Sequence, residues 1–307
     1  MKSNRREFVA ASALGVLGAA FGRVPLLGQQ PTGQPAPPPT VPKFEPIRRN
    51  VGIFSARGGA MGWLITPDAV LVIDSQFPDT AQMFLDGLKE RSPRKIDLLI
   101  NTHHHGDHTG GNKVLQPFVS KIVAHANVPE NQRKQAVAAK SEANQAYADT
   151  TFKDTWKADI GNEVVSAKYY GPGHTNGDVA IFFERANVVH MGDLMFNTRH
   201  PRVDRPGGAS VRNWIVALEA VVKDHNQDAI FVCGHAKVGL PLTASSKDLL
   251  GFRDYFTALL DYVQKGIAAG KSVDELSKVA ALPGFTNHEG VPTGTIQMAY
   301  EELTTKA

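Results

Sequence analysis

Short apolar runs of strand length alternate with helix-length segments along most of this chain, and that alternation restricts the fold more than any other feature. In the first half, strands are predicted at 51–54, 62–65, 69–73, 96–101 and 122–124, and helices at 79–90 and 129–148. In the second half, strands are predicted at 163–170, 179–183, 188–190 and 229–233, and helices at 211–223, 247–268, 273–281 and 295–303. We therefore expect a single α/β sandwich domain with polar clusters at its strand ends.

The first 46 residues have a different character. Arg5 and Arg6 precede an apolar run at 9–21, which is shorter than the roughly 20 apolar residues of a permanent membrane span. Residues 1–29 therefore resemble a twin-arginine signal peptide, which predicts export by the twin-arginine machinery to the periplasm or the medium, without a stable membrane anchor. Residues 30–46 are rich in proline and are expected to form an extended linker, so the folded domain should span 47–307.

Charge and cysteine content exclude two classes of protein. The formal net charge of +3 is carried entirely by residues 1–29, so the remaining chain is neutral and offers no basic surface for nucleic acid. The single cysteine, Cys233, excludes an intrachain disulfide and a cysteine-based zinc finger, and we interpret it as a buried residue at a strand end. The expected partner is a small-molecule substrate.

Four metal-donor side chains follow directly after the strand predicted at 96–101. His103 and His105 are two residues apart where that strand ends, so both project to the same side and can bind one metal ion. Gly106 permits a sharp turn, after which Asp107 and His108 can face a second ion beside the first. His104 lies on the opposite side of the run and is expected to pack or to bond to the backbone.

Three further donors lie beside glycines at predicted strand ends: His174 in a tight turn, Asp193 after the strand at 188–190, and His235 after the strand at 229–233. Each alone is open to a structural interpretation, as a turn histidine, a capping aspartate or a histidine bonded to the backbone. Their occurrence together in this order favours a metal centre.

These seven residues, His103-x-His105-x-Asp107-His108 followed by His174, Asp193 and His235, resemble the ligand set of the metallo-β-lactamase superfamily over about residues 51–236. The resemblance implies an αββα sandwich with its centre at one edge, between two sheets. It further implies that His103, His105 and His174 hold a first metal ion. Asp107, His108 and His235 would hold a second, and Asp193 would bridge both.

The implied function is that of an exported dinuclear zinc hydrolase that cleaves an amide or ester bond. Metal coordination lowers the pKa of water from about 15.7 toward 7, and Asp107 would orient the resulting hydroxide as the catalytic residue. A β-lactam ring or a related cyclic substrate is the first expectation. Two zinc ions are the expected cofactors, although two aspartates also suit iron or manganese.

Several alternatives stay open on the same residues. The presence of both His108 and Asp193 departs from the β-lactamase branches and resembles general hydrolases, including glyoxalase II-like thioesterases and lactonases. An iron-dependent sulfur dioxygenase shares the signature, and a metal-binding protein without turnover is a third reading, against which the intact Asp107 argues. Arg199, followed by His200 and Arg202, is a candidate for binding a substrate carboxylate, with a solvated basic loop as the alternative.

Overall fold

The computed structural model describes residues 41–305, so the predicted signal peptide lies outside the described residues. Two sheets dominate this part of the chain. The first is seven-stranded and runs in sequence order: neighbours from β1 to β4 are antiparallel, and neighbours from β4 to β7 are parallel. Its strands are β1 Lys43–Arg48, β2 Val51–Ser55, β3 Met61–Ile65, β4 Val70–Ile73, β5 Leu98–Asn101, β6 Ile122–His125 and β7 Thr150–Phe152.

The second sheet has six strands in the order β15-β13-β11-β10-β9-β8, and only the pair of β11 and β13 is parallel. A separate parallel ribbon joins β12 to β14. These strands are β8 Thr155–Ile160, β9 Glu163–Tyr169, β10 Val179–Phe183, β11 Val188–His190, β12 Phe196–Asn197, β13 Ile230–Val232, β14 His235–Ala236 and β15 Thr243–Ala244.

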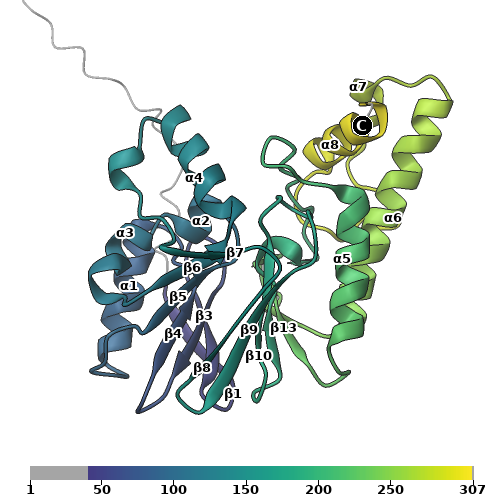
Figure 1. Cartoon of the computed structure of the whole chain (residues 1–307). Helices are drawn as coiled ribbons and strands as arrows, with labels where there is room; N and C mark the ends of the chain where they lie inside the picture. Colours follow the sequence, from purple (N-terminus) through teal and green to yellow (C-terminus); the bar gives the residue numbers. More distant parts are fainter. Residues whose placement is uncertain (1–40, 306–307) are drawn as a thin grey trace, which may run out of the picture. The chain divides into compact units, whose positions relative to one another are not determined.

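Helices α1 to α4 lie on the side of the first sheet and α5 to α8 on the side of the second, with α4, α7 and α8 toward the upper end of the view (Figure 1). The long helices begin at residues that cap them: the Ser210 hydroxyl accepts from the Asn213 amide, and Ser245 forms a capping box with Asp248. The helices are α1 Pro78–Lys89, α2 Gly106–Thr109, α3 Asn112–Leu115, α4 Asn127–Ala138, α5 Val211–Asp224, α6 Ser246–Ala268, α7 Val273–Leu276 and α8 Thr293–Thr304, with 3-10 turns η1 Gln116–Phe118, η2 Glu142–Asn144 and η3 Gly192–Leu194.

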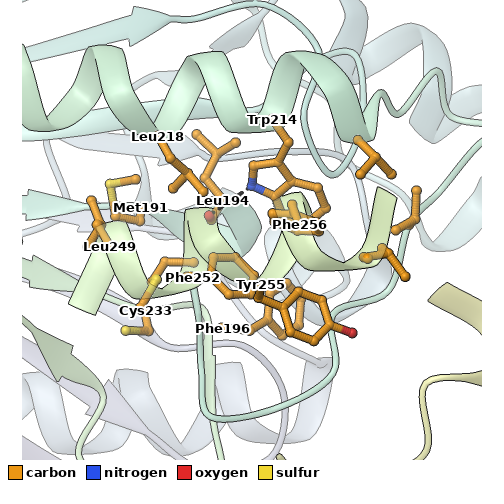
Figure 2. Close-up of a cluster of buried hydrophobic side chains, with 14 of the residues drawn as sticks. Met191, Leu194, Phe196, Trp214, Leu218, Cys233, Leu249, Phe252, Tyr255 and Phe256 are labelled. Atoms are coloured by element: carbon orange, nitrogen blue, oxygen red, sulfur yellow. Dashed lines mark hydrogen bonds between the residues drawn. The ribbon is translucent and has the colours of Figure 1, made fainter. Parts of the chain in front are cut away.

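Three apolar clusters hold these layers together. The central cluster joins the facing sides of the two sheets, with Leu71 and Ile100 on one side and Val165 and Ile181 on the other. A second cluster packs α1 against the first sheet. The third packs α5, α6 and α8 against the second sheet, and Figure 2 shows its aromatic centre around Trp214. This αββα arrangement confirms the predicted fold class.

Several boundaries differ from the sequence prediction, among them that of the helix predicted at 273–281, which ends at Leu276. β1 begins at Lys43, inside the segment expected to be linker, and includes Pro46. Proline is tolerated there because β1 is the edge strand of its sheet, so its missing amide costs no bond to a further strand. The helix predicted at 129–148 ends at Ala138, just before Lys140 takes a left-handed φ of 52°. No helix within residues 41–305 is long and apolar enough to cross a membrane.

Candidate metal centre

All seven predicted donors lie at strand ends on one edge of the sandwich. His103 and His105 follow β5, and the short helix α2 carries Asp107 and His108. His174 lies in the loop between β9 and β10. Asp193 lies in η3, directly after β11, and His235 begins β14, after β13. β5 of the first sheet and the parallel strands β11 and β13 of the second end at this edge, and the loop between the antiparallel β9 and β10 also reaches it, so donors distant in sequence converge here.

Three imidazoles form the first group of donors. Nδ1 of His105 lies 3.1 Å from Nε2 of His103 and 2.8 Å from Nε2 of His174. All three residues are buried, with at most 4% of their surface exposed. Zinc held by nitrogen at about 2.0–2.1 Å in a tetrahedral site keeps its ligands roughly 3.3 Å apart, so this spacing fits a single cation.

The other ring nitrogen of each imidazole faces an oxygen acceptor. Nδ1 of His103 lies 3.1 Å from the Thr102 hydroxyl, which itself donates to the Asp74 carboxylate at 2.7 Å. Nδ1 of His174 lies 2.7 Å from the carbonyl oxygen of Arg202.

Nε2 of His105 is likewise 2.8 Å from the carboxylate of Asp204. These acceptors assign the ring protons to the outer nitrogens and leave the three converging nitrogens with free lone pairs, which is the arrangement that metal ligands require.

The second group of donors is Asp107, His108 and His235. Oδ2 of Asp107 lies 3.1 Å from Nε2 of His235 and 3.7 Å from Nε2 of His108. Nδ1 of His108 donates to the fully buried Asp74 at 2.7 Å, so its Nε2 is free to face the group. His235 stacks on Phe196, with ring centroids 5.3 Å apart.

Asp193 lies between the two groups. Its Oδ2 is 3.4 Å from Nε2 of both His174 and His235, and its Oδ1 is 3.0 Å from Nε2 of His108. Neither Oδ1 nor the nitrogen of His108 makes an aligned hydrogen bond, although both are buried. Gly234 allows this approach, because a Cβ there would come within 2.1 Å of Oδ1.

The electrostatics of the two groups differ. Burial lowers the pKa of His103 and brings that of His174 to about 3, so both of these buried imidazoles favour the neutral form. Burial also opposes charge on His235, but the carboxylates of Asp193 and Asp107 outweigh it and raise its pKa to about 9. The same ion pairing overcomes burial and holds the pKa of Asp107 at about 2. The carboxylates of Asp107 and Asp193 therefore favour a positive charge among the donors of the second group.

Five of the seven donors, all but His103 and His108, line a cavity of about 200 Å³. Arg199 and Arg202 line it together with His200, and both arginines are exposed. Within residues 41–305, neither guanidinium forms an ion pair. The candidate substrate-binding residue Arg199 thus lines the cavity. No carboxylate within residues 41–305 forms an ion pair with its guanidinium.

Sequence reasoning missed two carboxylates that support the donors, Asp74 and Asp204. Asp74 directly follows β4, and this position could have suggested a role beside the neighbouring strand β5. Asp204 contacts His105 from a distant loop, and nothing in the sequence around it indicates that contact. His104 was expected to pack or to bond to the backbone. It is buried, with 2% of its surface exposed, and its Nε2 contacts two side chains, Gln135 at 2.9 Å and Asp204 at 3.4 Å.

The donor set suits a divalent cation. Five imidazoles and two carboxylates converge, and two of their buried polar atoms are left without hydrogen bonds. Mixed nitrogen and oxygen donors are compatible with zinc, and also with iron or manganese.

The sequence profile of the Metallo-beta-lactamase superfamily matches residues 57–235. Among curated proteins, the probable metallo-hydrolase MJ0888 of Methanocaldococcus jannaschii is 27% identical over 187 residues, covering 58% of this chain and 87% of that protein. The metallo-beta-lactamase type 2 of Elizabethkingia meningoseptica is 24% identical over 202 residues, covering 63% and 78%.

Solved structures show the same fold. A metallo-beta-lactamase from Pontibacter korlensis superposes with a TM-score of 0.59 at 17% identity, covering 71% of this chain and 99% of that one. The sec-alkylsulfatase Pisa1 from Pseudomonas sp. gives 0.65 at 15% identity, covering 82% of this chain and 49% of that one. With the profile spanning more than half of its residues and the donors in place, the chain belongs to the metallo-β-lactamase superfamily, whose members are generally metal-dependent hydrolases.

Proposed function

We propose that this protein is a dinuclear zinc hydrolase that cleaves an amide or ester bond in an anionic substrate, with a β-lactam ring or a related cyclic substrate as the first candidate. The observation that supports this most is the convergence of seven donors, five of which line a cavity that two arginines also line. The β-lactamases among its relatives support the choice of a first substrate.

In this proposal His103, His105 and His174 hold one ion, Asp107, His108 and His235 hold the other, and Asp193 contacts both. Bound divalent ions would supply Lewis acidity for polarising the scissile carbonyl and for activating water. Asp107 lines the cavity and keeps about a quarter of its side chain exposed, so its carboxylate can accept a hydrogen bond from the nucleophile and orient it.

Arg199 and Arg202 account for the anionic part of the proposal. Both line the cavity beside the donors, and a guanidinium binds a carboxylate or a sulfate through two parallel hydrogen bonds. The two acids that line the same cavity, Asp107 and Asp193, would be engaged by the metal ions. A substrate with a negative group adjacent to its scissile bond therefore fits the cavity.

The test is hydrolysis of a chromogenic cephalosporin by the zinc-loaded protein, with a chelated sample and Asp107→Ala beside it. Chelator-sensitive turnover that falls at least about 100-fold in Asp107→Ala is expected. The exposed Glu142→Ala is the matched control and should keep full activity. A lactone, a thioester and an alkyl sulfate extend the panel. Absence of hydrolysis across the panel, together with oxygen uptake by iron-loaded protein, would replace the proposal with sulfur oxidation.

We also propose that the chain is exported to the periplasm or the medium by the twin-arginine machinery. The support is sequence alone, namely Arg5-Arg6 ahead of a short apolar run. Cell fractionation tests it: the wild-type chain should appear outside the cytoplasm, and Arg5→Lys combined with Arg6→Lys should retain it inside. Export of both forms alike would contradict the assignment.

A further inference from the structure

We infer that the two halves of the metal centre differ in affinity, that the three-histidine site fills first, and that Asp204 is a positioning residue on which this order depends. The inference rests on the proposed two-metal centre and adds its order of loading. It comes from a difference in how the two groups of donors are held. The difference lies in the hydrogen bonds that hold the ligand side chains from behind, and not in the ligand side chains themselves.

Every imidazole of the first group is fixed at its outer nitrogen. Two of the three anchors come from one loop: the carbonyl of Arg202 holds His174, and the carboxylate of Asp204 holds His105. Because each outer nitrogen has an oxygen acceptor, both the ring orientation and the tautomer are set before a cation arrives.

The Asp204 carboxylate is itself held in place. The residue is 5% exposed, its amide donates to the His174 carbonyl at 3.1 Å, and its Oδ1 accepts from the Gly207 amide at 3.1 Å. The backbone around Gly207 passes so close that a Cβ there would lie 2.3 Å from Oδ2 of Asp204. The loop thus holds the Asp204 carboxylate in contact with His105.

The second group lacks this support. Of its three donors only His108 is anchored, by Asp74. The side chain of His235 is 15% exposed and that of Asp107 is 27% exposed. Phe196 stacks on the His235 ring, but among the hydrogen bonds within residues 41–305 none engages Nδ1 of His235, so its tautomer is not fixed.

A preformed site binds its ion without first ordering its ligands, whereas a partly exposed one must immobilise side chains on binding. The first site should therefore bind at least about tenfold more tightly than the second. Loss of an anchoring partner behind a ligand typically weakens metal affinity by about 10–100-fold, which sets the expected effect of removing Asp204.

The experiment is a titration of the full chain, stripped of metal, with Zn²⁺ against a competing chromophoric chelator, and with Co²⁺ followed by visible absorption. Two steps at least tenfold apart are expected for the wild type. His235→Ala assigns them, because it should remove the weaker step and leave the tighter one. Two steps of equal affinity would overturn the inference while leaving the proposed function intact. Absence of any uptake would instead refute the proposed function.

Variants behind the ligands complete the test. Asp204→Ala should weaken the tighter step 10–100-fold and change the weaker one less than about threefold, and Asp204→Asn, which keeps an acceptor, should recover part of the loss. Gln135→Met is the matched control, since it contacts His104 and not His105.

If Asp204→Ala does not fold, Gly207→Ala displaces the same carboxylate without removing it and should weaken the same step. An unchanged tighter step in both folded variants, or an equal loss in Gln135→Met, would refute the role of Asp204.

Discussion

Trp214 connects the largest apolar cluster to the loop that carries Asp193. The side chain is completely buried among Phe196, Phe252 and Phe256 (Figure 2). Its indole Nε1 donates to the carbonyl of Leu194 at 3.0 Å, one residue beyond Asp193. Trp214→Phe keeps an aromatic ring in this place but removes the hydrogen-bond donor and reduces the volume of the side chain.

The expected loss follows from these contacts. The smaller ring leaves a void of roughly 40 Å³, which at about 24 cal/mol per Å³ costs about 1 kcal/mol. The Leu194 carbonyl loses its indole donor in a buried place, which costs about 1–3 kcal/mol more. Trp214→Phe should therefore reduce the free energy of unfolding by about 2–4 kcal/mol.

Urea denaturation of chelated protein, followed by far-ultraviolet circular dichroism, measures this loss without a contribution from metal binding. Val216→Ala is the control on the same helix, because Val216 is 57% exposed, and it should change stability by less than about 0.5 kcal/mol. A loss below about 1 kcal/mol in Trp214→Phe would mean that neither the void nor the unpaired carbonyl matters, and the reasoning would fail.

Three further predictions concern the centre and its surroundings. Zn²⁺ at 100 times its dissociation constant should raise the free energy of unfolding by about 2.7 kcal/mol. A melting temperature that changes with neither Zn²⁺ nor chelator would contradict a metal centre. Arg199→Ala with Arg202→Ala should raise KM for an anionic substrate roughly 10–100-fold and leave kcat within about threefold, whereas equal effects on a neutral analogue would refute anion binding. Burial, with His200 nearby, lowers the pKa of His288 to about 4. Because the unfolded chain binds a proton at this histidine more readily than the native one, the free energy of unfolding decreases as pH falls from 6.5 through 4. His288→Gln should therefore reduce the loss of stability in acid by about 1 kcal/mol, after allowance for the partial exposure of His288, as measured by urea titrations at several pH values.

The sequence was sufficient to predict the buried strands. Runs such as 69–73 and 179–183 are apolar and bounded by turn residues, so period and length together identify them. The side chains that the structure brings together at the candidate centre had drawn attention either by their local spacing, as for His103 and His105, or by following a strand, as for Asp193. The burial predicted for Cys233 is confirmed, and burial raises the pKa of its thiol.

What escaped prediction depends on contacts that the sequence does not encode locally. The segment 139–148 has a helical composition, yet the side chain of Gln132 bonds to the carbonyl of Ala146 at 3.2 Å, and the chain turns back to allow it. The pairing of β1 with β2 draws Pro46 into a sheet edge. Asp204 reaches His105 across 99 positions, and only the folded loop reveals that contact.

The centre is thus a product of the complete domain. Four donors come from the half of the chain that builds the first sheet, and His174, Asp193 and His235 come from the half that builds the second. An unfolded chain spreads these donors from residue 103 to residue 235 and cannot present them together, so nearly all of the metal-binding free energy is available to the native state. A cation shared by His105 and His174 would tie the two sheets at the edge where their apolar core ends. If the chain is exported already folded, as we propose, the centre is complete before the membrane is crossed, and metal can be acquired in the compartment where the chain folds.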